Sequence, residues 1–122
     1  MKCFQFLILL SILFYGCKKE YIPEETDFID GLQFKNGMTI YGHKYDSLII
    51  DNCSFTKKGL VISNVSYVVV RNCTFKNIKG DAIEIGFLAE ADNILIENCI
   101  FDNIGLNGID SHENAPSCVI RA

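Results

Sequence analysis

The sequence has little positive charge, and this argues against one class of function. Its 122 residues carry 11 Lys and Arg against 15 Asp and Glu, a formal net charge of −4. A nucleic-acid groove needs clustered Lys and Arg, so we expect no nucleic-acid partner. The chain is also short, because a typical domain takes about 100–150 residues. We therefore expect one domain at most.

A long apolar run and a helical repeat are also missing. The apolar run from Phe4 to Tyr15 is interrupted by Gln5 and Ser11. It is shorter than the roughly 20 residues that cross a bilayer. The β-branched stretches further along show no helical periodicity, which favours strands. A hydrophobic content of 49% with 21% charged residues is typical of a globular chain and not of a disordered one.

What the N-terminus does have is a pattern that predicts an export signal. Lys2 precedes the apolar run, which has the length of a signal-peptide core. The run ends in Leu13-Phe14-Tyr15-Gly16-Cys17, which resembles the lipobox of bacterial lipoproteins. The resemblance implies that Cys17 is the lipidated first residue of the mature chain. Plain secretion and an uncleaved anchor are the alternatives.

This interpretation divides the chain into three parts. Residues 1–16 are the predicted signal peptide. Residues 17–27 are polar, with Pro23 and several Glu, and we expect a lipidated tether there. The remainder, 28–122, would be the folded domain. The predicted location is the bacterial outer membrane or cell surface, with the lipid as the membrane partner.

The folded part repeats one short phrase three times. Its copies are Asp51-Asn52-Cys53-Ser54-Phe55, Arg71-Asn72-Cys73-Thr74-Phe75 and Glu97-Asn98-Cys99-Ile100-Phe101, each after an apolar run. The Asn residues are offset by 20 and then 26 residues (72 − 52; 98 − 72). Periods of this size with β-branched residues predict a solenoid with one turn per repeat.

Each turn is expected to contain three strands. Alternate residues before the Asn, and Cys and Phe after it, should point inward. The Asn itself suits a left-handed corner and can hydrogen-bond to the next Asn in the stack. The third strands are expected at Gly37 to Ile40, Gly59 to Ile62, Ala82 to Ile85 and Gly108 to Ser111. The fold class is therefore all-β, a parallel β-helix.

These features resemble the right-handed parallel β-helix of the pectate-lyase-like superfamily over about 28–122. Ser117 to Arg121 opens a further turn, and Ala122 falls where the corner Asn belongs. Because a finished solenoid ends in a polar cap, we interpret the chain as an N-terminal fragment whose β-helix is incomplete at the C-terminus.

Two outward columns test this alignment. The first is Asp51, Arg71, Glu97 and Arg121, in which the sign of the charge alternates from turn to turn. The second is apolar and consists of Ile49, Val69, Leu95 and Val119. An apolar column outside a β-helix is normally covered, and the sequence does not show by what.

The cysteines of the repeats require a separate interpretation. Cys53, Cys73 and Cys99 share one position of the turn, and Cys118 occupies another. A column of buried free thiols is favoured, because free Cys packs as a small hydrophobe. A disulfide or a metal site is the alternative in an exported chain.

Acidic residues mark the candidate site. Gly80 to Val119 contains eight Asp and Glu and no Lys or Arg. Glu84 and Asp110 occupy the same outward position in successive turns, so their Cα atoms should lie about 4.8 Å apart. Asp81 precedes the first of these strands, and His112 follows Asp110 at the mouth of a loop.

Three interpretations of this face remain open. Asp81, Glu84 and Asp110 are candidate ligands of Ca²⁺, which prefers oxygen. Glu84, Asp110 and His112 are candidate catalytic residues for acid–base cleavage of a glycosidic bond. The third interpretation is a solvated acidic face without a ligand.

Two functions follow from the resemblance. The first is a surface lipoprotein that binds or cleaves an extracellular polysaccharide, as a lyase or a glycoside hydrolase. The second is a non-catalytic β-helix that serves in adhesion or as a scaffold, with the outer apolar column as its docking face.

Overall fold

Thirteen short strands make up the computed structural model, which describes residues 26–41, 47–86, 91–112 and 118–121. Cys17, the predicted signal peptide and nearly all of the predicted tether lie outside the described residues. The first strand begins at Asp27. Within the described residues no helix is long and apolar enough to cross a membrane.

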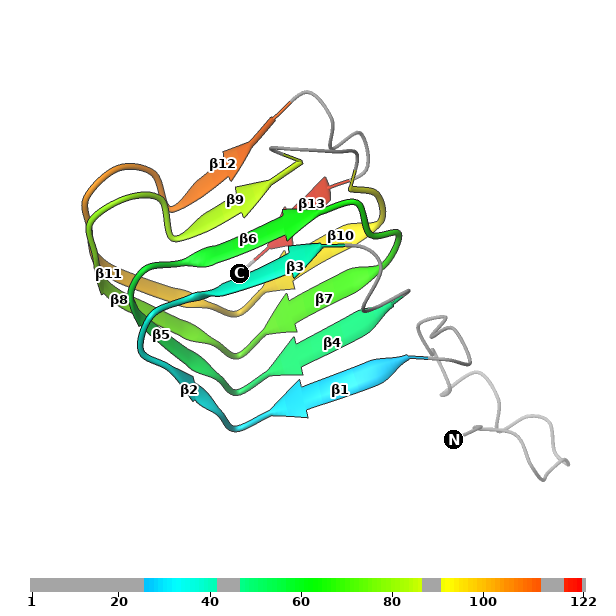
Figure 1. Cartoon of the computed structure of the whole chain (residues 1–122), viewed down its shortest axis with the longest axis horizontal. Helices are drawn as coiled ribbons and strands as arrows, with labels where there is room; N and C mark the ends of the chain where they lie inside the picture. The colour runs from blue at the N-terminus through cyan, green and yellow to red at the C-terminus, as the bar shows by residue number, and fades with distance from the viewer. Residues whose placement is uncertain (1–25, 42–46, 87–90, 113–117, 122) are drawn as a thin grey trace, which may run out of the picture.

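The strands form three parallel sheets, which we name A, B and C (Figure 1). Sheet A contains β1 (Asp27–Asp30), β4 (Leu48–Asp51), β7 (Val68–Arg71), β10 (Ile94–Glu97) and β13 (Cys118–Arg121). Sheet B contains β2 (Gln33–Phe34), β5 (Ser54–Lys57), β8 (Thr74–Ile78) and β11 (Ile100–Ile104). Sheet C contains β3 (Met38–Tyr41), β6 (Leu60–Ser63), β9 (Ile83–Ile85) and β12 (Ile109–Ser111).

Each strand pairs with its counterpart in the next turn, so the chain winds through A, B and C in order. The prediction of an all-β parallel solenoid with three strands per turn is confirmed. The register is the one expected from the repeats: Ile50 pairs with Val70, and Phe55 pairs with Phe75. The predicted third strands are correct to within one residue at their ends.

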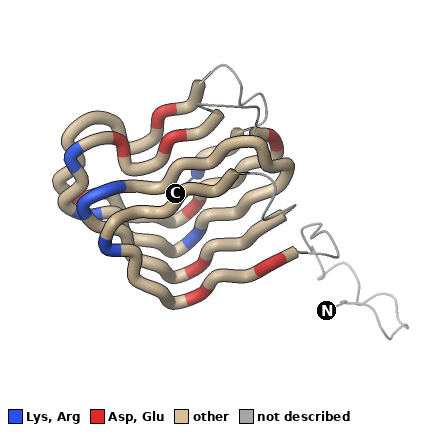
Figure 2. The backbone as a smooth tube through the Cα atoms, in the orientation of Figure 1, with Lys and Arg blue, Asp and Glu red and all other residues tan. Residues whose placement is uncertain are grey.

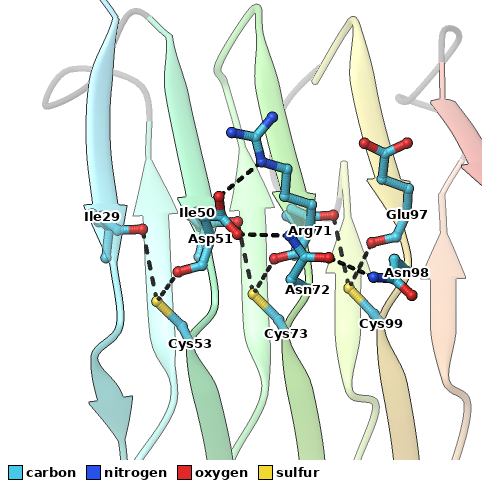
Figure 3. A network of polar contacts seen from close by, with 11 residues as sticks. Ile29, Ile50, Asp51, Cys53, Arg71, Asn72, Cys73, Glu97, Asn98 and Cys99 are labelled. Carbon is cyan, nitrogen blue, oxygen red and sulfur yellow. Dashed lines mark hydrogen bonds and ion pairs between the residues drawn. The ribbon is translucent and has the colours of Figure 1, made fainter.

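Asparagine forms the corner between sheets A and B, as predicted. Asn52, Asn72 and Asn98 have φ angles of 57°, 55° and 52°, in the left-handed region that Asn tolerates better than most residues. The Nδ2 of Asn98 donates to Oδ1 of Asn72, whereas Nδ2 of Asn72 donates to Oδ1 of Asp51 at 2.9 Å (Figure 3). The amide ladder therefore ends on a carboxylate.

A second pair of left-handed asparagines was not predicted from the sequence. Asn77 and Asn103, in strands β8 and β11, have φ angles of 56° and 58°. The Nδ2 of Asn103 donates to Oδ1 of Asn77 at 2.8 Å. In the preceding turn Lys57 adopts the left-handed conformation with φ of 72°, next to a register shift between β5 and β8.

The interior is filled by stacked columns of like side chains. The rings of Phe55 and Phe75 are parallel, with centroids 4.6 Å apart, and Phe101 continues the stack at 5.3 Å. Phe34, which lies outside the three repeats, begins the stack 5.0 Å from Phe55. The expected inward residues of sheet A, such as Ile50 and Val70, are fully buried.

The cysteine column is made of free thiols in the structure. All four cysteines of the described residues are free. Cys73 donates to the carbonyl of Arg71 at 3.2 Å and lies 3.7 Å from that of Ile50 in the preceding turn (Figure 3). Cys53 makes the equivalent pair of contacts. A hydrogen bond with the neighbouring Cys99 and burial both raise the pKa of Cys73 above its ordinary value, which favours the neutral thiol.

The two outward columns of sheet A behave differently. The charged column forms two ion pairs, Arg71 to Asp51 at 3.0 Å and Arg121 to Glu97 at 2.9 Å. In the apolar column Ile49 and Val69 are each only 1% exposed although neither belongs to the core cluster, whereas Val119 is 54% exposed. The apolar column is thus covered in its middle turns, as the sequence led us to expect.

Candidate functional site

The candidate site lies on the outer face of sheet C, in the third and fourth turns. Glu84 is the middle residue of β9 and Asp110 is the middle residue of β12, and the two are paired in register. The neighbours of Glu84 in β9, Ile83 and Ile85, are fully buried. Because side chains alternate along a strand, both carboxylates point away from the core. The predicted stacking of the two acids is confirmed.

His112 joins these carboxylates from the residue that follows β12. Its backbone N–H donates to the carbonyl of Ile85 at 2.9 Å, which continues the parallel pairing beyond the strand. Its Nε2 lies 3.1 Å from Oε2 of Glu84 and 3.6 Å from Oδ2 of Asp110. We call these three residues the Glu84–Asp110–His112 centre.

The centre is partly shielded but open to solvent. The side chains of His112, Glu84 and Asp110 are 33%, 24% and 35% exposed. Its three ligand atoms, one from each residue, all lie within 4.8 Å of one another. An imidazole between two carboxylates can carry a proton, can exchange it with a bound molecule, or can share a cation with them.

Asp81 is not part of this centre. Its Oδ1 accepts hydrogen bonds from Asn107, from the backbone N–H at 2.9 Å and from Nδ2 at 3.1 Å. Asp81 therefore fixes the turn that enters β12. The predicted ligand set of Asp81, Glu84 and Asp110 is thus not assembled. Among the described residues, the group that could hold an ion contains His112 in place of Asp81.

Charge is unevenly distributed around the solenoid (Figure 2). Basic residues lie at the corner that leads from sheet B to sheet C, where Lys57 and Lys58 occur in the second turn and Lys79 occurs in the third. Acidic positions lie on the neighbouring strands β9 and β12. The sequence from Gly80 to Val119 contains no Lys or Arg. The basic group that contacts both carboxylates is His112.

One further residue of this face was missed in the sequence. Tyr41 ends β3, follows the buried Ile40 and is 45% exposed. It is paired with Ser63 of β6. The signal that could have identified it is its place one residue after the expected third strand, where the alternation turns a side chain outward. Sheet C thus presents an aromatic ring in its first turn and the centre in its last two.

Comparison with known protein families gives a match. A family model described as a right-handed β-helix region matches residues 12–121, which is nearly the whole chain. No curated protein and no solved structure matches the chain.

Proposed function

The chain belongs to the right-handed β-helix family, and from that premise we propose that it is an exported lipoprotein whose outer sheet C face binds an extracellular polysaccharide. The observation that carries this proposal is the placement of the Glu84–Asp110–His112 centre on the same sheet face as the exposed Tyr41. Cleavage of the bound saccharide is the catalytic form of the same proposal.

The chemistry of this face supports a saccharide ligand. Sugar hydroxyls both donate and accept hydrogen bonds, and carboxylates and imidazole offer partners of both kinds. The apolar faces of sugar rings pack on aromatic side chains, which supply a large apolar surface with a polar tip. A stack of parallel strands offers a repeating surface every 4.8 Å or so along its axis, which suits a polymer of repeating units.

Cleavage would draw on the same three residues. In glycoside hydrolases one carboxylic acid protonates the leaving oxygen and a carboxylate acts as base or nucleophile. Glu84 and Asp110 are the pair of carboxyl groups on this face, and His112 contacts both. A lyase would instead need a base to remove a proton from the sugar ring, and His112 is the candidate.

The anchor is part of the proposal. Cys17 is the residue that would carry the lipid, which would hold the β-helix at the outer membrane or cell surface. A Cys17→Ser variant should be released from membranes, with loss of the acylated N-terminal peptide in mass spectrometry. Equal membrane retention of the variant would contradict a lipid at this residue.

The test of binding is a polysaccharide array probed with the full chain in detergent solution. We expect binding to at least one polysaccharide class. A Tyr41→Ala variant and a Glu84→Gln/Asp110→Asn double variant should each lose most of it. Asp102→Asn changes an exposed acid of β11 outside the face and serves as the matched control. Incubation of the bound polysaccharide with the protein, followed by analysis of chain length, then separates binding from cleavage.

A scaffold or adhesion role is the second candidate, and the apolar column of sheet A favours it. Ile49 and Val69 are buried outside the core, and Val119 of the same column is exposed. Because Ile49 and Val69 are already covered, the docking face for another protein would be the exposed ends of this column, Phe28 and Val119, which are 61% and 54% exposed. If the chain has a normal fold by circular dichroism but binds no polysaccharide on the array, the scaffold or adhesion role is favoured.

A further inference from the structure

We propose that the Glu84–Asp110–His112 centre binds a divalent metal ion of the zinc class. This inference does not depend on the polysaccharide proposal, because it concerns a metal site that could serve a binding, catalytic or structural role. It rests on the separation of the three donor atoms, on the local charge and on the kinds of donor that meet there.

The donor atoms are spaced as ligands of one small ion are. For metal–ligand distances of about 2.0–2.2 Å, neighbouring ligands of a tetrahedral or octahedral shell lie about 3.0–3.6 Å apart. Nε2 of His112 lies 3.1 Å from Glu84 Oε2 and 3.6 Å from Asp110 Oδ2. All three atoms fall within 4.8 Å of one another, so a small closure of the two carboxylates would complete one face of a shell.

The backbone holds these three residues in place. Glu84 and Asp110 are fixed by the parallel pairing of β9 with β12, and His112 by the hydrogen bond from its N–H to the carbonyl of Ile85. The centre is therefore built on strands and on the residue next to a strand. Such positions hold ligands more firmly than loops do.

Charge favours a cation at this point. Two carboxylates stacked in successive turns repel each other unless a proton or a cation lies between them. Among the described residues, the printed ion pairs of Glu84 and Asp110 are both with His112 and none is with Lys or Arg. A protonated imidazole would satisfy both carboxylates without a metal, and the experiment below separates the two arrangements.

The kinds of donor select the ion. Ca²⁺ takes six to eight oxygen ligands, and this centre offers two carboxylates and a nitrogen. Imidazole suits Zn²⁺ and its transition-metal neighbours. Three protein ligands leave at least one position open, as in catalytic zinc sites. That position would hold water or a hydroxyl of a bound molecule.

The test is titration of the full chain in detergent with Zn²⁺ by calorimetry at neutral pH, followed by Co²⁺ as a spectroscopic substitute. We expect one site per chain. His112→Gln and Glu84→Gln should each weaken binding at least about tenfold, because loss of even an outer-shell partner costs 10- to 100-fold. Asp102→Asn should bind as the wild type does. The Co²⁺ complex should show ligand-field bands without the near-ultraviolet charge transfer that thiolate ligands produce.

Three results would overturn the proposal. The first is no binding of either metal by the folded chain, which would leave a protonated His112 as the cation. The second is equal affinity in the wild type and in His112→Gln. The third is a thiolate charge-transfer band that accounts for all bound Co²⁺, which would assign the metal to cysteine. If the wild-type chain binds the metal but binds no polysaccharide on the array, the proposed function is refuted and the metal site is not.

Discussion

Single residues at the corner between sheets A and B join the turns of the solenoid. Asn72 adopts a left-handed φ of 55°, and its amide contacts both neighbouring turns. Asp51, which accepts from Asn72 and from Arg71, ends the ladder. These contacts link residues about twenty positions apart in sequence, so they tie one turn to the next.

Asp51 should make the stability of the fold sensitive to acid. Burial opposes its ionisation, but hydrogen bonds from Asn72 and Arg71 and the charge of Arg71 outweigh burial and hold the pKa of Asp51 below its ordinary value. A lowered folded-state pKa stabilises the fold above about pH 4, and this contribution is lost as the pH falls through the folded value. Urea unfolding should therefore show a smaller loss of stability between pH 7 and about pH 3 in Asp51→Asn than in the wild type.

The titration of Asp51 itself provides the control. In an Arg71→Gln variant, which removes the ion pair at 3.0 Å, the pKa of the Asp51 carboxyl measured by NMR should rise. An unchanged titration midpoint would show that Arg71 does not stabilise the carboxylate, and the acid sensitivity would need another source.

At the scale of elements, the phenylalanine stack holds sheet B against the core. Phe75 is fully buried between Phe55 and Phe101. Removal of a buried Phe side chain costs about 3–5 kcal/mol in transfer and cavity free energy, so Phe75→Ala should lower the free energy of unfolding by about that amount in chemical denaturation. Ile100→Ala, at a side chain 62% exposed in β11, is the matched control. Equal, small losses in the two variants would refute the inward register of sheet B.

The corner between sheets B and C requires glycine at residue 105, because successive turns approach closely there. A Cβ at Gly105 would lie 2.0 Å from the carbonyl oxygen of Lys79 in the preceding turn, whereas a Cβ at Gly80 would meet nothing within 4 Å. Forced overpacking typically costs about 1–3 kcal/mol. We expect Gly105→Ala to lower the melting temperature clearly and Gly80→Ala to leave it nearly unchanged. A tolerated Gly105→Ala would mean that the turns are further apart at this corner.

The elements themselves were largely predictable, because the corner phrase recurs. Each Asn-Cys-x-Phe copy fixes two strands, and alternation then assigns the inward side chains on either side. The left-handed pair Asn77 and Asn103 was not predicted, although its offset (103 − 77 = 26) equals that of the main repeat (98 − 72 = 26). The place of Phe34 in the phenylalanine stack was not predicted, because its turn lacks the Asn-Cys pair that precedes the other stacked Phe residues.

The candidate site was only partly predictable. The register placed Glu84 beside Asp110, since both occupy the same strand position in successive turns. Whether Asp81 or His112 would complete the group depends on side-chain direction at the ends of strands, where the alternation rule no longer applies. Asp81 accepts hydrogen bonds from Asn107, which lies 26 residues later in the sequence. The Nε2 of His112 instead contacts Glu84 of β9 and Asp110 of β12. Sequence spacing alone does not distinguish these outcomes.

At the scale of the whole molecule, the faces of the solenoid differ in side-chain chemistry. Sheet A carries the charge ladder and a largely covered apolar column, and the corner toward sheet C carries lysines. Sheet C carries the carboxylate–imidazole centre and Tyr41. We propose that sheet C is the face that contacts a polysaccharide.

The most direct test of that claim is an NMR titration of the isotopically labelled full chain with an oligosaccharide of the class selected on the array. We expect the amide shifts to change along sheet C, mainly around Glu84, Asp110 and His112, and the amide shifts of sheet A to remain unchanged. Shift changes confined to sheet A, around Ile49 and Val69, would contradict it.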